Sequence, residues 1–95
     1  MGRSHHFHLD QGSHSITVNV GRGRSGEIEL LVNGKVISYE GSHESGTTVL
    51  AGVLPEDPPR PFLVRVRQPH FAPLRLRCTL ELDGVEQQMP ERLLV

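Results

Sequence analysis

Four histidines stand close together near the start of the chain, at His5, His6, His8 and His14. In an extended segment His6 and His8 lie on one face, and two imidazoles at this spacing can chelate Zn²⁺, Cu²⁺ or Ni²⁺. A functional metal site also needs further ligands and outer hydrogen-bond partners, and Asp10 is the one carboxylate nearby. Two interpretations follow: a metal site at His6 and His8, or ordinary solvent-facing rings of an arm or strand.

A second group of charged side chains lies further along, where residues 60–77 contain five arginines and no acidic residue. Alternation places Arg65 and Arg67 on the outward face of one expected strand, and Arg75 and Arg77 on that of the next. If these strands pair, the four guanidinium groups form a patch that suits phosphate or carboxylate groups, which would make the domain a module that binds an acidic protein, an anion or a nucleic acid. The alternative is neutralisation within the domain. The acidic candidates for it are Glu27, Glu29, Glu81 and Glu86.

The overall charge does not favour a polyanionic partner. Lys and Arg number 10 and Asp and Glu number 11, which gives a formal net charge of −1, so the chain as a whole does not attract nucleic acid. Three Phe, one Tyr and no Trp leave few rings to stack on bases. With no run of 18 apolar residues and no secretory signal, we expect a cytoplasmic protein that binds another protein and no membrane.

No arrangement of residues predicts an enzyme or a cofactor. The letters of residues 21–26 match G-x-G-x-x-G, but the residues that follow predict a strand, and phosphate binding needs a helix there. Cys78 is the single cysteine, which excludes an internal disulfide, and its inward place in a strand predicts a buried, unreactive thiol. No Ser–His–Asp set is recognisable. We therefore expect a non-enzymatic protein without a cofactor.

The elements that position these residues are strands, because apolar residues recur with period two and no helical stripe exceeds two turns. Asn33-Gly34 and Asp83-Gly84 each predict a two-residue hairpin turn. In the first hairpin the expected register sets Val32 opposite Lys35, Leu30 opposite Ile37 and Ile28 opposite Tyr39.

Six or seven strands without a helix predict an all-β fold, a single antiparallel β-sandwich. Residues 1–14 differ in composition from the rest and are expected to form a flexible, histidine-containing arm, with the sandwich domain over residues 15–95. An edge strand offers unpaired N–H and C=O groups to another chain. We expect a homodimer contact at such an edge.

Two segments carry a family resemblance, LLVNGKVISYE and CTLELDGVEQQMPE. Their order and hairpins resemble those of the β-sandwich domain of Fas apoptotic inhibitory molecule, over roughly residues 15–90. The chain is also similar to small bacterial proteins that share this fold and have no known activity. The resemblance implies a non-enzymatic interaction or scaffold domain.

Overall fold

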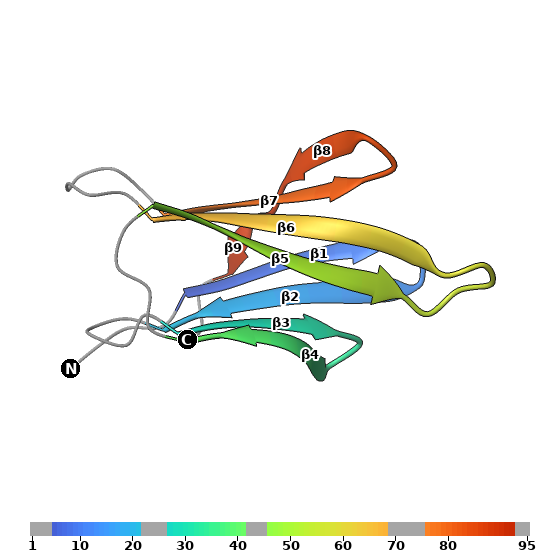
Figure 1. Cartoon of the computed structure of the whole chain (residues 1–95), viewed down its shortest axis with the longest axis horizontal. Coiled ribbons are helices and arrows are strands. Elements are labelled where there is room, and N and C mark those ends of the chain that lie inside the picture. The colour runs from blue at the N-terminus through green and yellow to red at the C-terminus, as the bar shows by residue number, and fades with distance from the viewer. Residues whose placement is uncertain (1–4, 22–26, 42–45, 69–75, 93–95) are drawn as a thin grey trace.

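The structure is a computed structural model that describes residues 5–21, 27–41, 46–68 and 76–92. Its strands form two antiparallel sheets that lie face to face (Figure 1), which confirms the predicted all-β sandwich. The five-stranded sheet has the order β4-β3-β2-β1-β9, and the four-stranded sheet the order β5-β6-β7-β8. No helix long and apolar enough to span a membrane occurs among the described residues.

The strand bounds show that each sheet is built mainly from one continuous part of the chain. The five-stranded sheet contains β1 (His5–Gln11), β2 (His14–Val20), β3 (Ile28–Val32), β4 (Lys35–Glu40) and β9 (Glu91–Arg92). The four-stranded sheet contains β5 (Gly46–Leu54), β6 (Arg60–Gln68), β7 (Arg77–Leu82) and β8 (Val85–Gln88). The C-terminal strand β9 alone leaves its neighbours in sequence to join the other sheet.

The core lies between the sheets and is supplied by alternate residues of the inner strands. The five-stranded sheet contributes Ile16, Val18, Val20, Ile28, Leu30 and Val32, and the four-stranded sheet contributes Phe62, Val64, Val66, Cys78, Leu80 and Leu82. Because successive strand side chains point to opposite faces, the period-two pattern in the sequence becomes one buried and one outward face in each sheet.

The two short hairpin turns are confirmed by the backbone. Asn33 and Gly34 have φ values of 52° and 82°, and Asp83 and Gly84 have φ values of 54° and 76°. Two successive positive φ angles are the requirement of a type I′ turn, and its twist matches that of the flanking strands.

The register predicted for the first hairpin is correct next to the turn and wrong further from it. Val32 lies opposite Lys35 as expected, but an irregularity between Leu30 and Leu31 shifts the pairing. Ser38 therefore lies opposite Leu30 in place of Ile37. Likewise, Glu40 takes the expected position of Tyr39 opposite Ile28. An extra residue in one strand, as in a β-bulge, moves every later pair by one position.

The N-terminal segment also differs from the expectation of a flexible arm over residues 1–14. Residues 5–11 form β1, which pairs along its whole length with β2 and on its other side with β9. Phe7 is buried at 2% exposure. The physical reason is that Phe7 and Leu9 alternate with outward polar residues, so that this segment covers part of the core as a half-buried strand does. Residues 1–4 lie outside the described residues.

Candidate functional site

The longest edge strand among the described residues is β5. This strand ends the four-stranded sheet, so that its inner side pairs with β6 and its other side has no strand partner in the described part of the chain. Its residues, Gly46–Leu54, include no charge and no proline, and its register with β6 is continuous over nine pairs. Natural edges are usually protected by charge, proline, a bulge or short length. The β5 edge has none of these.

Apolar side chains gather on the two neighbouring edge strands, β4 and β5. Among the described residues, five of the six exposed large hydrophobic side chains lie on them. They are Val36, Ile37 and Tyr39 of β4 and Val49 and Val53 of β5, each 40–54% exposed. We call these five residues the edge strip. Exposed apolar side chains on neighbouring strands make this side of the sandwich a candidate site of association.

The side chain of Ile37 on β4 contacts β5 at Gly52. A Cβ atom built on Gly52 would lie 2.8 Å from Cδ1 of Ile37 and 2.5 Å from Cζ of Phe62. These distances are shorter than van der Waals contact, so only glycine leaves room there for both side chains. Gly52 therefore allows the Ile37 side chain to pack directly against the backbone of β5.

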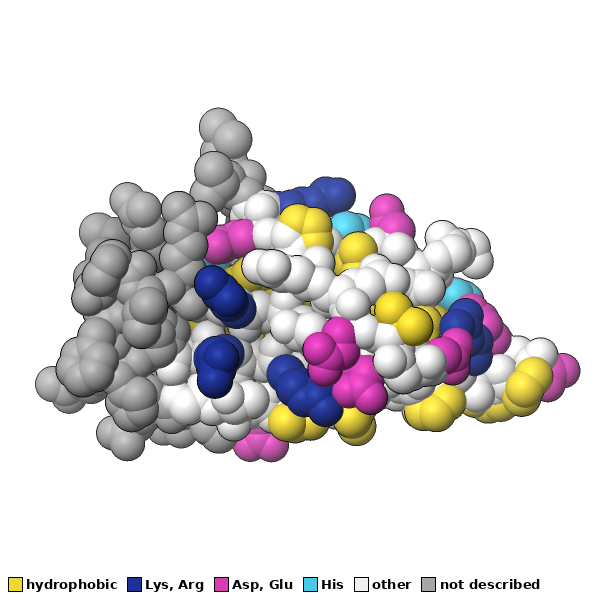
Figure 2. Space-filling view, turned by 90° about the horizontal axis from the view of Figure 1, so that it is seen from above, with side chains coloured by type: hydrophobic (Ala, Val, Ile, Leu, Met, Phe, Trp, Pro, Cys, Tyr) yellow, Lys and Arg dark blue, Asp and Glu magenta, His cyan; other side chains and the backbone are white. Residues whose placement is uncertain are grey.

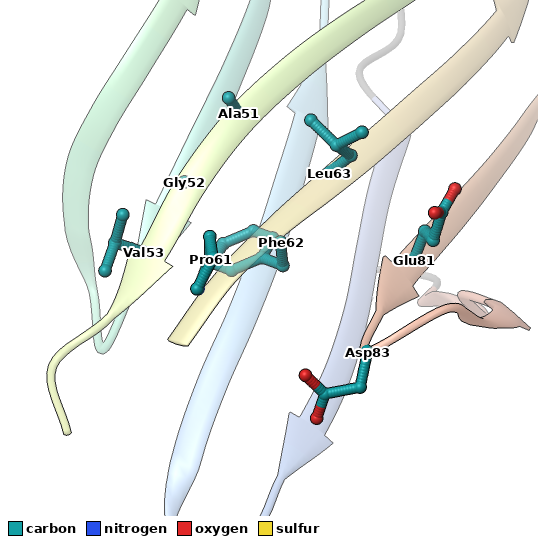
Figure 3. A pocket seen from close by; sticks show the side chains of 8 residues that line it. All are labelled: Ala51, Gly52, Val53, Pro61, Phe62, Leu63, Glu81 and Asp83. Atoms are coloured by element: carbon teal, nitrogen blue, oxygen red, sulfur yellow. The ribbon is translucent and has the colours of Figure 1, made fainter. Parts of the chain in front are cut away.

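A shallow open hollow of about 390 Å³ adjoins the β5 edge on the outer face of the same sheet. Its lining consists of Ala51, Gly52, Val53, Pro61, Phe62, Leu63, Glu81 and Asp83 (Figure 3). The two carboxylates already have partners, because Glu81 accepts a hydrogen bond of 2.6 Å from Arg65 and Asp83 accepts one from Arg60. The hollow is thus lined by apolar residues where β5 and β6 form it. Near β7 its two carboxylates are already paired with arginines of the domain.

The predicted arginine face divides into a neutralised part and an uncompensated part. Arg65 Nη1 lies 2.6 Å from Glu81 Oε1 and 3.6 Å from Glu86 Oε2. The hydrogen bond to Glu81 and the charges of both carboxylates raise the pKa of Arg65. Cross-strand neutralisation is therefore present, as one of the two sequence interpretations expected, and it comes from β7 and β8.

Arg67 and Arg77 behave differently. They lie directly opposite each other on β6 and β7, both exposed, and within the described residues neither has an ion pair. Figure 2 looks down on this outer face and shows basic side chains along it, some against acidic side chains and others nearer the grey end. Arg75, the fourth predicted member, lies outside the described residues.

Two of the acidic candidates lie on the side of the opposite sheet, Glu29 within β3 and Glu27 directly before it, and both have hydrogen-bond partners there. Glu27 Oε2 accepts a 2.8 Å hydrogen bond from the hydroxyl of Tyr39. Glu29 Oε1 accepts one of 3.4 Å from the Asn19 amide. The expectation that they could neutralise the arginine patch is wrong, because the sequence pattern did not show which strands share a sheet.

His6 and His8 do share one face of β1, as their spacing predicts, and each is held by a neighbour. The Nδ1 atom of His6 lies 2.6 Å from Oδ1 of Asn19. His8 contacts Thr17 through Nδ1 at 3.1 Å and Asp10 through Nε2 at 2.8 Å. No cluster of three or more His, Cys, Asp or Glu residues suited to a metal occurs in the described ranges. The metal hypothesis has no third ligand there.

A feature that the sequence did not reveal is a polar connection between the sheets near the hairpin turns. His14 lies 3.1 Å from the Asn33 amide and 3.4 Å from Glu56 Oε2, so that it links the five-stranded sheet to the β5–β6 loop. Glu56 in turn lies 3.7 Å from Arg60, which also pairs with Asp83. These contacts tie together the ends of both sheets.

Comparisons of this chain with protein-family models, with curated proteins and with solved structures found no match. The likeness to the Fas apoptotic inhibitory molecule domain thus stays an expectation from two hairpin segments. The strongest feature of the structure itself is the β5 edge. Its signal in the sequence is the run GTTVLAGVL, nine residues without a charge or a proline.

Proposed function

We propose that this domain is a non-enzymatic interaction module that associates with a second copy of itself through the edge of β5. The observation that carries the proposal is the uncharged, unpaired nine-residue edge next to the edge strip. Addition of a strand to such an edge is a recurrent mode of protein recognition, in which backbone hydrogen bonds supply affinity and side-chain neighbours supply register.

The symmetry of the strand favours a second copy as the occupant. A two-fold axis that passes through Leu50, the midpoint of β5, sets Val49 opposite Ala51 of the second copy and Thr47 opposite Val53. In such an interface the same strand of both copies meets, and residues close to the axis lie near their own counterparts, so that charges there would repel each other. The strand carries no charge, and the net charge of the whole chain is −1. Self-pairing therefore meets little electrostatic resistance.

The geometry of the proposed dimer extends the sheet without rearranging the core. Leu50 and Leu54 stay buried under their own sheet, whereas Val49 and Val53, both 50% exposed, gain neighbours from the second copy. The paired strands would be about 30 Å long, since each residue of a strand advances about 3.3 Å. The two four-stranded sheets would become one continuous sheet.

Sedimentation equilibrium of a Val49→Lys variant tests the proposal. We expect the wild-type chain to dimerise and the variant to be monomeric, with a dissociation constant raised at least about tenfold, equivalent to about 1.4 kcal/mol. The reason is that the substitution sets two lysines close to the two-fold axis of the interface. Residue 49 faces outward and lies opposite Arg65, whose charge Glu81 and Glu86 already offset, so thermal stability measured at monomeric concentrations should stay close to that of the wild type.

The matched control is Val85→Lys on β8, at the opposite edge of the same sheet, where Val85 is 57% exposed. It makes the same change of size and charge and should leave the dimer intact. A wild-type chain that stays monomeric at high concentration, or a dimer lost with Val85→Lys and kept with Val49→Lys, would contradict the proposal.

A further inference from the structure

The arrangement of Arg67 and Arg77 is costly for an isolated domain. Like charges directly opposite each other on antiparallel strands destabilise the pair. These two side chains occupy such positions, are both exposed, and have no ion pair with any described residue. Two opposed positive charges without a counter-charge among the described residues are the observation from which the inference starts.

The rest of the same face shows what the pair lacks. Arg65, two residues before Arg67 on β6, has both Glu81 and Glu86 within 3.6 Å. At the other end of β6, Arg60 pairs with Asp83 and Glu56. The described residues therefore supply acidic partners to Arg60 and Arg65 and none to the opposed pair of Arg67 and Arg77. The register also sets exposed Thr47 of β5 beside Arg67.

We propose that Arg67 and Arg77, with the hydroxyl of Thr47 beside them, form a binding site for a phosphate monoester group. Two guanidinium groups supply forked N–H donors that match phosphate oxygens, and their two positive charges match a group that carries about −1.5 to −2 at neutral pH. The two arginines lie on β6 and β7, on the outer face of the four-stranded sheet, and only Thr47 belongs to the edge strand β5.

The surroundings of the pair favour a single phosphate group over a nucleic acid. A long polyanion that follows the sheet would meet the carboxylates of Glu81 and Glu86 next to Arg65. Within the described residues this outer face carries no exposed aromatic ring, since Phe62 points inward and is 3% exposed. Base stacking, on which single-strand binding depends, has no platform there.

The probe is inorganic phosphate, measured by the thermal melting point of the full chain against sodium chloride at equal ionic strength. We expect phosphate to raise the melting point of the wild type. Arg67→Gln and Arg77→Gln should each weaken phosphate binding about tenfold or more, because each removes a charge-assisted contact. Arg60→Gln is the matched control on the same strand, with the same change of net charge, and should keep the wild-type response.

Arg77→Glu provides an independent arm, because it sets an acid directly opposite Arg67. We expect it to raise the melting point without phosphate and to abolish the response to phosphate. The proposal is overturned if phosphate stabilises no better than chloride, if all variants respond alike, or if Arg77→Glu lowers the melting point and keeps the phosphate response.

Phosphoserine and a single-stranded oligonucleotide, added in place of inorganic phosphate, test the class of ligand. Binding of phosphoserine that depends on Arg67 and Arg77 but not on Arg60 supports the monoester site. If the oligonucleotide binds more tightly per phosphate and Arg60→Gln weakens it too, the assignment to a monoester is wrong and the face binds nucleic acid.

Discussion

Replacement of Phe7 by alanine is expected to lower the free energy of unfolding by about 3–5 kcal/mol, the usual cost of removing a buried aromatic ring. Phe7 is 2% exposed and belongs to the main core cluster, although it stands only six residues from the start of the chain. In a small domain a loss of about 1 kcal/mol moves the melting point by about 4–8 °C. Denaturant unfolding followed by circular dichroism measures the change.

His8→Ala is the control for this experiment, since it alters the neighbouring residue of the same strand on the outward face. His8 contacts Thr17 and Asp10 there, and its loss should cost no more than about 1 kcal/mol. If Phe7→Ala were as mild as His8→Ala, residues 5–11 would behave as an arm, and the assignment of β1 to the core would fail.

The second large effect concerns Cys78, whose thiol should react with a disulfide reagent at pH 8 at least about 30-fold more slowly in the folded chain than in the unfolded chain. Burial raises the pKa of Cys78 from 9.0 to about 12, which lowers the thiolate fraction about 10³-fold, and the greater nucleophilicity of a thiolate of high pKa offsets only part of this loss. The chain has no other cysteine, so the whole signal belongs to this residue. Labelling of the native protein and of the protein in guanidinium chloride gives the ratio.

The same shift predicts how stability depends on pH. The folded state keeps the thiol protonated up to a higher pH than the unfolded state, so this contribution to stability is complete below about pH 9 and is lost as the pH rises toward 12. Its slope is at most about 1.4 kcal/mol per pH unit. Equal labelling rates in the folded and unfolded chains would show that Cys78 does not face the core.

Local signals in the sequence predicted the parts of the fold that depend on few neighbours. Asn33-Gly34 and Asp83-Gly84 are turns because their backbone angles suit those residues, and Leu80 is buried because alternation alone points it inward. The segment of β1 was missed although it alternates, because its outward positions carry histidines and its two apolar residues are too few to outweigh the polar composition.

Features that depend on the arrangement of whole sheets were beyond prediction. No local pattern shows that β5 ends a sheet, because an edge strand and a central strand can share the same alternation. Likewise, the pairing of Arg67 with Arg77 depends on the register across the connection between β6 and β7. The sequence predicted neutralisation of Arg65 by Glu81 as one of two alternatives. The register between β6 and β7 in the structure decides between them.

The two-part origin of the sheets has a consequence for the order in which the chain folds. Each of β1 to β4 and of β5 to β8 pairs with its neighbours in sequence, and β9 with β1 is the one long-range pairing among the described strands. Local pairings close short loops and form quickly, whereas distant ones must first overcome the entropy of a long loop. We therefore expect the hairpins within each half to form first, and the pairing of residues 91–92 with β1, which completes the five-stranded sheet, to form last.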